Sequence, residues 1–144
     1  MADTKYLRYD VETYVRARLA LVHGANFHPQ RLSLKGGGLH GFDAVSENGM
    51  IVMGVKTCAL SNGKLKAGQV KNAISELWYL SLIEAATRTL VLTNRPFYDA
   101  FLKEMKGRLH SEIGVECIEL PADMQMEVDK IIRDASQEDP RRSR

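Results

Sequence analysis

The sequence predicts an α/β protein in which one mixed β-sheet is flanked by helices. Three observations point to this class. An Asn48-Gly49 pair separates two apolar, β-prone runs; two longer segments carry apolar residues at helical spacing; and Thr89–Thr93 is a short, β-branched run of the kind found in buried strands. With 144 residues, of which 44% are apolar and 26% charged, the chain suits one globular domain. We expect that domain to span residues 1–135, followed by a disordered polar tail, 136–144.

The first half of the chain is expected to form a helix and three strands. Val11, Val15 and Leu19 recur at helical spacing, and Gly24 ends the helix. The expected elements are a helix at Leu7–His23, a strand at Asn26–Leu34, a glycine-rich loop at Lys35–His40, and hairpin strands at Gly41–Glu47 and Met50–Thr57.

The second half alternates helices and strands. The middle helix is expected to bury an apolar stripe of Val70, Ile74, Leu77, Trp78 and Leu82. The next helix begins with a proline in its first turn. The expected elements are a helix at Ala67–Ala86, a strand at Thr89–Thr93, a helix at Pro96–Leu109, a strand at Gly114–Leu120 and a helix at Ala122–Ala135. The complete order is αβββαβ, extended by αβα.

The hairpin brings together residues that suggest chemistry. The Asn48-Gly49 turn fixes a register in which Val45 opposes Val52 and Asp43 opposes Gly54. Because residues two apart in a strand share a face, Lys56 should lie on that face too. An aspartate that faces a strand ending in X-X-Lys suits a Mg²⁺ site beside an ammonium group. Position 54, where a second carboxylate would be expected, is a glycine.

Charge is distributed unevenly along the chain, although the formal net charge is only +2. The stretch from residue 23 to residue 71 contains only two acidic residues, Asp43 and Glu47. Its basic residues are His23, His28, Arg31, Lys35, His40, Lys56, Lys64, Lys66 and Lys71. A basic half around a carboxylate hairpin suits a polyanionic substrate, and a solvated surface is the simpler alternative.

Other classes find little support in the sequence. Cys58 and Cys117 lack the spacing of a zinc site or of a disulfide scaffold, so reduced thiols are expected. No apolar run approaches the roughly 20 residues of a membrane span, and the N-terminus lacks the layout of a signal peptide. The expected location is therefore the cytoplasm.

The element order, with Asp43 and Lys56 on its second and third strands, resembles the PD-(D/E)XK, or restriction-endonuclease-like, nuclease superfamily. Mrr-type restriction endonucleases and archaeal Holliday-junction resolvases are the branches that it resembles most. The segments that carry the resemblance are Val11-Glu12, Arg31-Leu32-Ser33 before the glycine loop, Gly41-Phe42-Asp43, Gly54-Val55-Lys56, and Gln69 at the start of the middle helix.

The resemblance implies a metal-dependent nuclease that hydrolyses DNA phosphodiester bonds. Asp43 and Glu12, with the main-chain carbonyl of Val55, would hold Mg²⁺ or Mn²⁺, and Lys56 would stabilise the transition state. Arg31, Ser33, Lys35 and Gln69 would contact the nucleic-acid backbone, and the Gly36–Gly38 loop would let main-chain N–H groups approach phosphate. Glu76, two turns beyond Gln69, is a less favoured metal ligand. Enzymes of this fold that cut duplexes commonly pair subunits, so we expect a homodimer.

Gly54 departs from this family pattern and leaves alternatives open. A nuclease-fold module that binds DNA without cutting it is one; an α/β domain with an unrelated ligand is another. Gly54→Glu would complete the site if space is free there, and would clash if a neighbouring side chain needs the room. Asp43 could instead bond the loop backbone, and Glu12 could instead pair with Arg8 or Arg16. His40 is expected to be a loop residue and not a ligand.

Overall fold

The computed structural model describes residues 4–138, with side chains for residues 7–134. Its elements are α1 (Thr4–His23), β1 (Phe27–Ser33), β2 (Leu39–Ser46), β3 (Ile51–Lys56), α2 (Ala67–Ser81), β4 (Thr87–Leu92), α3 (Arg95–Glu104), β5 (Gly114–Cys117) and α4 (Ala122–Glu138). The predicted element order is therefore confirmed, and the chain is an α/β protein. In the described residues, no helix is both long and apolar enough to cross a membrane.

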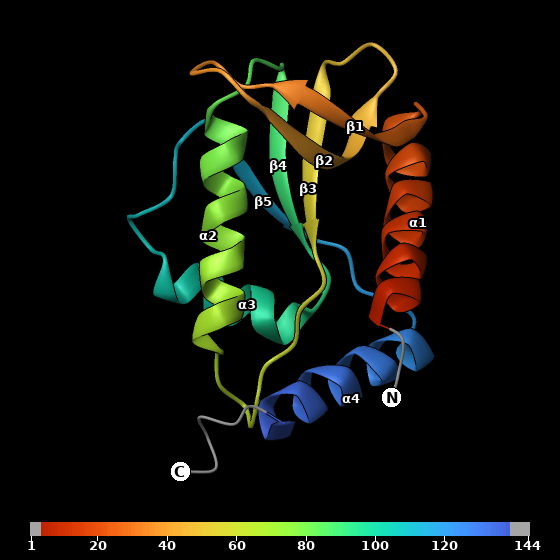
Figure 1. Cartoon of the computed structure of the whole chain (residues 1–144), viewed down its shortest axis with the longest axis vertical. Helices are drawn as coiled ribbons and strands as arrows, with labels where there is room; N and C mark the ends of the chain where they lie inside the picture. Colours follow the sequence, from red (N-terminus) through yellow and green to blue (C-terminus); the bar gives the residue numbers. More distant parts are fainter. Residues whose placement is uncertain (1–3, 139–144) are drawn as a thin grey trace.

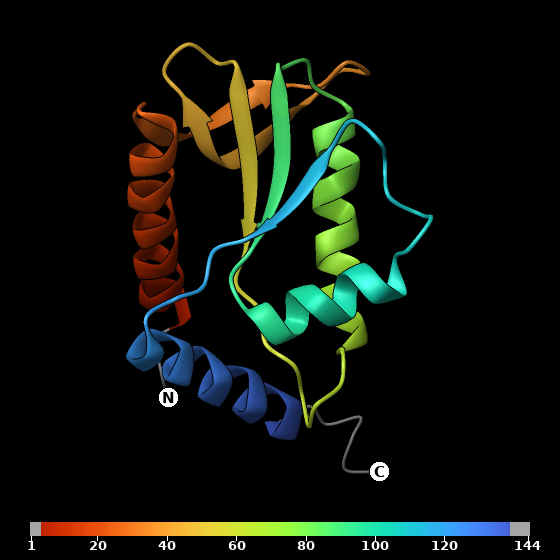
Figure 2. The same cartoon turned by 180° about the vertical axis from the view of Figure 1, so that it is seen from behind.

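The five strands form one mixed sheet in the order β1-β2-β3-β4-β5. β1, β2 and β3 pair antiparallel, whereas β3, β4 and β5 pair parallel. β3 is therefore the strand at which the direction of pairing changes. Helices cover both faces: α1 and α4 lie on one, and α2 and α3 on the other (Figures 1 and 2).

Two hydrophobic clusters hold these layers together. On the α1 side, Val11, Val15 and Leu19 pack against strand residues that include Met53 and Val91. On the α2 side, Ala73 and Leu80 of α2 and two phenylalanines of α3 pack against Val52, Leu90 and Leu92. Along β3, alternate side chains enter opposite clusters, as expected for a strand that is buried on both faces.

Several element ends differ from the predictions. α2 ends at Ser81, α3 at Glu104 and β5 at Cys117, all earlier than expected. α4 continues to Glu138, into the segment that the sequence assigned to the polar tail, and residues 139–144 lie outside the described residues.

The β2–β3 connection keeps the predicted register with a wider turn. Gly49 N–H donates to the carbonyl of Ser46 (2.9 Å), and Gly49 has a φ of +72°, a left-handed conformation that suits glycine. The Asn48 side chain also accepts from the main-chain N–H of Met50 (3.0 Å). Val45 lies opposite Val52, as predicted, and the same register sets Asp43 opposite Gly54.

A β-bulge interrupts β2 at Asp43. His28 pairs with Val45 and Gln30 with Phe42, so two β2 residues, Asp43 and Ala44, lie opposite Pro29 alone. Proline has no N–H for a ladder bond and is tolerated at such bulges. The bulge changes which face the strand residues address: Phe42 packs in the α2-side cluster, and Ala44 packs in the α1-side cluster. Asp43 lies at this changeover.

The apolar stripe predicted for α2 is confirmed only in part: Val70 and Leu77 pack against the α2-side cluster, whereas two other members face solvent. Trp78, expected in the core, is 64% exposed, and Ile74 is also exposed. The fully buried positions are Ala73, Glu76 and Leu80. Because the buried face has a glutamate at its centre, apolar periodicity alone pointed to a neighbouring face of the helix.

Candidate active site

The Asp43 carboxylate lies in the gap where β2 and β3 separate. Strand pairing ends at Ala44–Met53, one residue before the Asp43–Gly54 position. In place of a ladder bond, Asp43 Oδ2 accepts from the Val55 main-chain N–H at 2.7 Å. Simple alternation along the strand had predicted that Asp43 lies on the face that carries Lys56. The bulge instead directs Asp43 between the two strands.

The Val55 carbonyl points toward the same gap. In a strand, the N–H and C=O of one residue point to the same side, and those of the next residue point to the other. The Lys56 carbonyl accepts from Thr93 beyond β4 (3.3 Å), which places it on the side away from β2. The Val55 carbonyl is thus directed toward Asp43, as required of a main-chain ligand beside that carboxylate.

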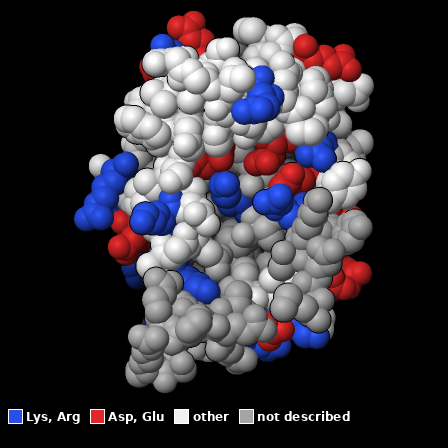
Figure 3. Space-filling view, viewed as in Figure 1, with Lys and Arg blue, Asp and Glu red and all other residues white. Residues whose placement is uncertain are grey.

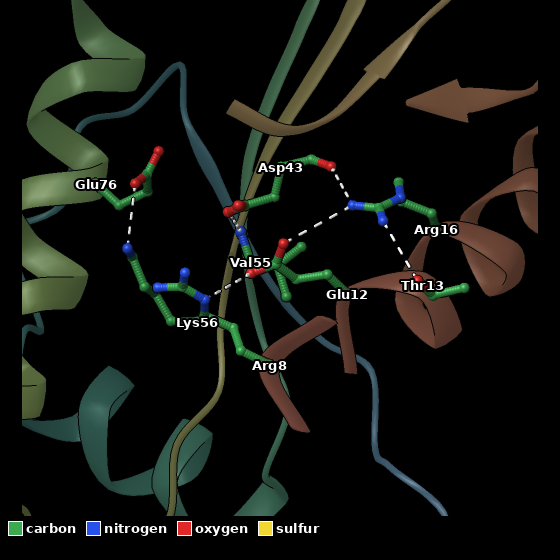
Figure 4. A network of polar contacts seen from close by, with 8 residues as sticks. All are labelled: Arg8, Glu12, Thr13, Arg16, Asp43, Val55, Lys56 and Glu76. Atoms are coloured by element: carbon green, nitrogen blue, oxygen red, sulfur yellow. Dashed lines mark hydrogen bonds and ion pairs between the residues drawn. The ribbon is translucent and has the colours of Figure 1, made fainter. Parts of the chain in front are cut away.

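Glu12 reaches this gap from α1 (Figure 4). Burial raises the pKa of the Glu12 carboxyl, and the charge of Asp43 raises it further. Arg8 and Arg16 oppose these effects, as does Lys56 more weakly. Glu12 is thus close enough for the charges of both Asp43 and Lys56 to act on its carboxyl. The three charged groups come from three different elements, α1, β2 and β3.

Arginines hold Glu12 in place. Arg8 and Arg16 each lie 3.9 Å from one of its oxygens, so the ion pairs proposed as an alternative role for Glu12 are present beside the site. Arg16 also donates from Nη1 to the Asp43 carbonyl at 2.9 Å. Arg16 thereby ties α1 to the bulge of β2 and joins the two acidic residues through one guanidinium.

Lys56 is paired with Glu76 of α2. Its Nζ lies 3.4 Å from Glu76 Oε1 (Figure 4). The Glu76 side chain is only 4% exposed, whereas that of Lys56 is 34% exposed. The ammonium therefore sits at the edge of the site with a buried carboxylate behind it, and it can approach a ligand from there.

The glycine at position 54 gives Glu76 its space. A Cβ on Gly54 would lie 2.3 Å from Glu76 Cγ and 2.6 Å from Glu76 Oε2, closer than any real contact of this kind. A glutamate at position 54 would overlap Glu76, which favours the clash over the completed site as the outcome of Gly54→Glu. The carboxylate missing from β3 has a counterpart on the helix that packs over it. The sequence ranked Glu76 low, and the glycine itself was the signal that a neighbour occupies this place.

The face that carries the site is hollowed. Figure 3 shows acidic and basic side chains gathered in a central hollow, below the β1–β2 hairpin and between α1 and α2. Arg31 and Ser33 are exposed along β1, and Lys35 is exposed where β1 turns into β2. They border the sheet near its edge, and no described contact links their side chains to Asp43 or Lys56.

Two other features that were predicted to contact the nucleic-acid backbone, Gln69 and the glycine loop, make hydrogen bonds within the protein. Gln69 Oε1 accepts from the Ala59 main-chain N–H at 3.1 Å, which ties the start of α2 to the segment after β3. In the glycine loop, the Gly37 N–H donates to the Leu34 carbonyl at 3.0 Å. That N–H group is therefore engaged within the turn.

Two carboxylates and a main-chain oxygen are the groups that this gap offers to a metal ion. In the part of the chain described, no three side chains of His, Cys, Asp or Glu form a group that could hold one. Mg²⁺ commonly takes one or two carboxylates and completes its shell with waters and phosphate oxygens. Asp43, Glu12 and the Val55 carbonyl fit this pattern. Burial first, and then the charge of Asp43, raise the pKa of the Glu12 carboxyl, and a bound cation would offset both effects.

Comparisons with protein-family models, with curated proteins and with solved structures found no match to this chain. A functional assignment therefore has to be built from the site geometry.

Proposed function

We propose that this protein is a metal-dependent nuclease of the restriction-endonuclease-like class that hydrolyses DNA phosphodiester bonds. The observation that carries the proposal is the meeting of Glu12, Asp43 and Lys56 where β2 and β3 separate. Two acids beside a lysine are the groups that phosphodiester hydrolysis needs: ligands for a divalent cation and an ammonium for the developing charge.

Mg²⁺ or Mn²⁺ is the proposed cofactor. Asp43 and Glu12 would hold the ion, together with the Val55 carbonyl. The chemistry that such an ion supplies is polarisation of a phosphate oxygen and a lower pKa for bound water. Asp43 keeps Oδ1 for this role while Oδ2 accepts from Val55.

Lys56 is proposed to stabilise the transition state. Its ammonium would exchange the 3.4 Å contact with Glu76 for a phosphate oxygen, and would donate to the charge that builds there. Glu76 then acts as the partner that keeps Lys56 in place between turnovers. This arrangement accounts for a nuclease with glycine at position 54, because Glu76 and a side chain there cannot coexist.

DNA is the proposed substrate because the site is bordered by basic residues. Arg31 and Lys35, in and just after β1, and Lys64 and Lys71, just before and in α2, are exposed, and we propose that they contact backbone phosphates. Such contacts release counterions, so binding should weaken steeply as salt is added.

Cleavage assays test this proposal. Supercoiled, branched and single-stranded DNA would be incubated with Mg²⁺ or Mn²⁺ and wild-type protein, Asp43→Asn or Lys56→Met. Asparagine can still accept from the Val55 N–H, so the fold should persist. We expect either change to lower the cleavage rate on the order of 100-fold, while DNA affinity changes little.

Matched controls are Glu47→Gln, an exposed acid at the end of the same hairpin, and Lys106→Met, an exposed lysine after α3 that has no part in the proposed DNA contacts. Both should cleave like wild type. DNA binding without cleavage, with both metals and all substrates, would overturn the nuclease proposal and leave a binding module. Equal cleavage by wild type and Asp43→Asn would overturn it as well, because the activity would then arise elsewhere.

A further inference from the structure

His40 is fixed by aromatic neighbours on the α2 side of the sheet. Its ring stacks on Tyr79, with centroids 3.7 Å apart and an interplanar angle of 7°. The ring also meets Phe42 edge to face at 4.8 Å. Two ring contacts at different angles leave the imidazole little freedom to turn.

This fixed ring directs Nε2 at Glu76. Nε2 lies 3.4 Å from Oε1 and 3.4 Å from Oε2 of that carboxylate. The contact with Oε1 is a hydrogen bond, whereas Oε2 is fully buried and has no hydrogen-bond partner in the described structure. Protonated imidazole can donate from Nε2, and so can the neutral tautomer with its hydrogen on Nε2.

The Glu76 carboxylate therefore lies between two donors, His40 and Lys56. A buried carboxylate is costly unless donors satisfy it, so the directions of these donors decide which orientation Glu76 adopts. Lys56 is flexible and must leave to reach a substrate. His40 is the donor that can stay.

We propose that His40 is a positioning residue that holds the Glu76 carboxylate against Gly54 and so fixes the point from which Lys56 reaches the scissile phosphate. The inference rests on the proposed nuclease function and extends it to a residue outside the reacting groups. A purely structural role would be served as well by phenylalanine, because the neighbours of the ring are aromatic; the polar atom of His40 is the one aimed at the carboxylate.

Two substitutions separate the roles of the ring and of its nitrogen. His40→Phe keeps a ring against Tyr79 and Phe42 but removes the donor. His40→Gln removes the ring and restores an N–H donor of similar reach. We expect His40→Phe to lower the cleavage rate roughly tenfold with little change in DNA affinity, as is typical for residues that orient a reacting group, and His40→Gln to recover most of that loss.

A double-mutant cycle tests whether His40 acts through Glu76. Once Glu76→Gln is present, His40→Phe should lower cleavage little further. Additive losses, or full activity in His40→Phe, would overturn the inference even if the wild type is a nuclease.

Denaturant unfolding of the same four proteins keeps the two proposals distinguishable. A non-additive shift in the unfolding midpoint would establish the His40–Glu76 coupling independently of catalysis. If the wild-type protein cleaves no substrate, the proposed function is refuted. The double-mutant cycle measured by unfolding would still decide whether His40 holds the Glu76 carboxylate. If the shifts in unfolding midpoint of the two single variants simply add in the double variant, His40 does not hold Glu76.

Discussion

At the scale of single residues, Gly54 and Glu76 form one structural feature. Gly54 lies in β3 and its φ is not positive, so the backbone conformation does not require glycine there. Glycine is required because a Cβ would take space that a neighbouring side chain occupies. The Glu76 side chain fills that space, and its carboxylate forms the ion pair with Lys56. Each residue therefore constrains which residue can occupy the other position.

Gly54→Ala should destabilise the fold. The added methyl group would overlap Glu76 Cγ, and overpacking of this kind costs about 1–3 kcal/mol of unfolding free energy. Adding Glu76→Ala should recover much of that loss, because the obstructing side chain is gone. Urea unfolding measures both effects.

Gly68→Ala is the control for this prediction. Gly68 lies in α2, where an added Cβ would meet no atom within 4 Å, so alanine should stabilise the helix by about 0.5–1 kcal/mol. Equal stability of Gly54→Ala and wild type would show that Glu76 does not occupy the space over β3.

The sequence predicted part of the candidate site at this scale. Asp43 and Lys56 were found because a short turn fixes their register, and strand spacing is regular enough to extrapolate. Glu76 ranked low because it joins the site through packing of a helix onto a strand, which no local pattern encodes. His40 was expected to be a loop residue, yet it lies in β2, and its contacts with Tyr79 and Glu76 join it to α2.

At the scale of elements, the bulge in β2 and the docking of α1 form the site together. The bulge turns Asp43 into the gap between strands, and α1 brings Glu12 to the same gap. Arg16 connects the two through its bond to the Asp43 carbonyl. Its side chain is 14% exposed, so this connection is shielded from solvent.

Arg16→Met should loosen this connection. The change keeps most of the aliphatic stem but removes the donor to Asp43 and one cationic partner of Glu12. Hydrogen bonds to charged groups contribute about 1.5–3 kcal/mol, so unfolding free energy should fall by that order. Binding of Mn²⁺, measured calorimetrically, should also weaken, because Glu12 loses part of its support.

Arg18→Met is the matched control, since Arg18 is on the same helix and exposed. It should leave both unfolding and Mn²⁺ binding near wild type. Unchanged metal binding in Arg16→Met would contradict a site that uses Glu12.

The order of elements was predictable, but their orientation was less so. Hydrophobic spacing and turn residues locate helices and strands, and these signals are local. The rotation of α2 was missed because Glu76 sits on the buried face while Trp78 is exposed. The bulge was missed because it depends on how Pro29 pairs with the neighbouring strand, which sequence spacing does not reveal.

At the scale of the whole molecule, the sheet separates two helical layers, and the site draws on both. α1 lies on one face and α2 on the other, and side chains from both helices reach the region where β2 and β3 diverge (Figures 1 and 4). Each chain therefore carries one complete set of the proposed reacting groups. One such set can address one phosphodiester bond at a time.

We predict that the protein forms a homodimer. A duplex has two strands of opposite polarity, and a two-fold pair of sites would match them; C₂ dimers are also the commonest closed oligomers. Light scattering from low to high micromolar concentration should give twice the 16.2 kDa chain mass. A monomer mass at high micromolar concentration would contradict the prediction.

Cleavage kinetics provide a second measurement of the same dimer. On supercoiled DNA, paired sites should yield linear product early, because both strands can be cut within one encounter. Mixing wild type with excess Asp43→Asn should produce heterodimers that nick one strand, so nicked circles should accumulate. If the mixture instead yields the products of wild type alone at lower rate, the two sites act independently and each subunit cuts as a separate enzyme.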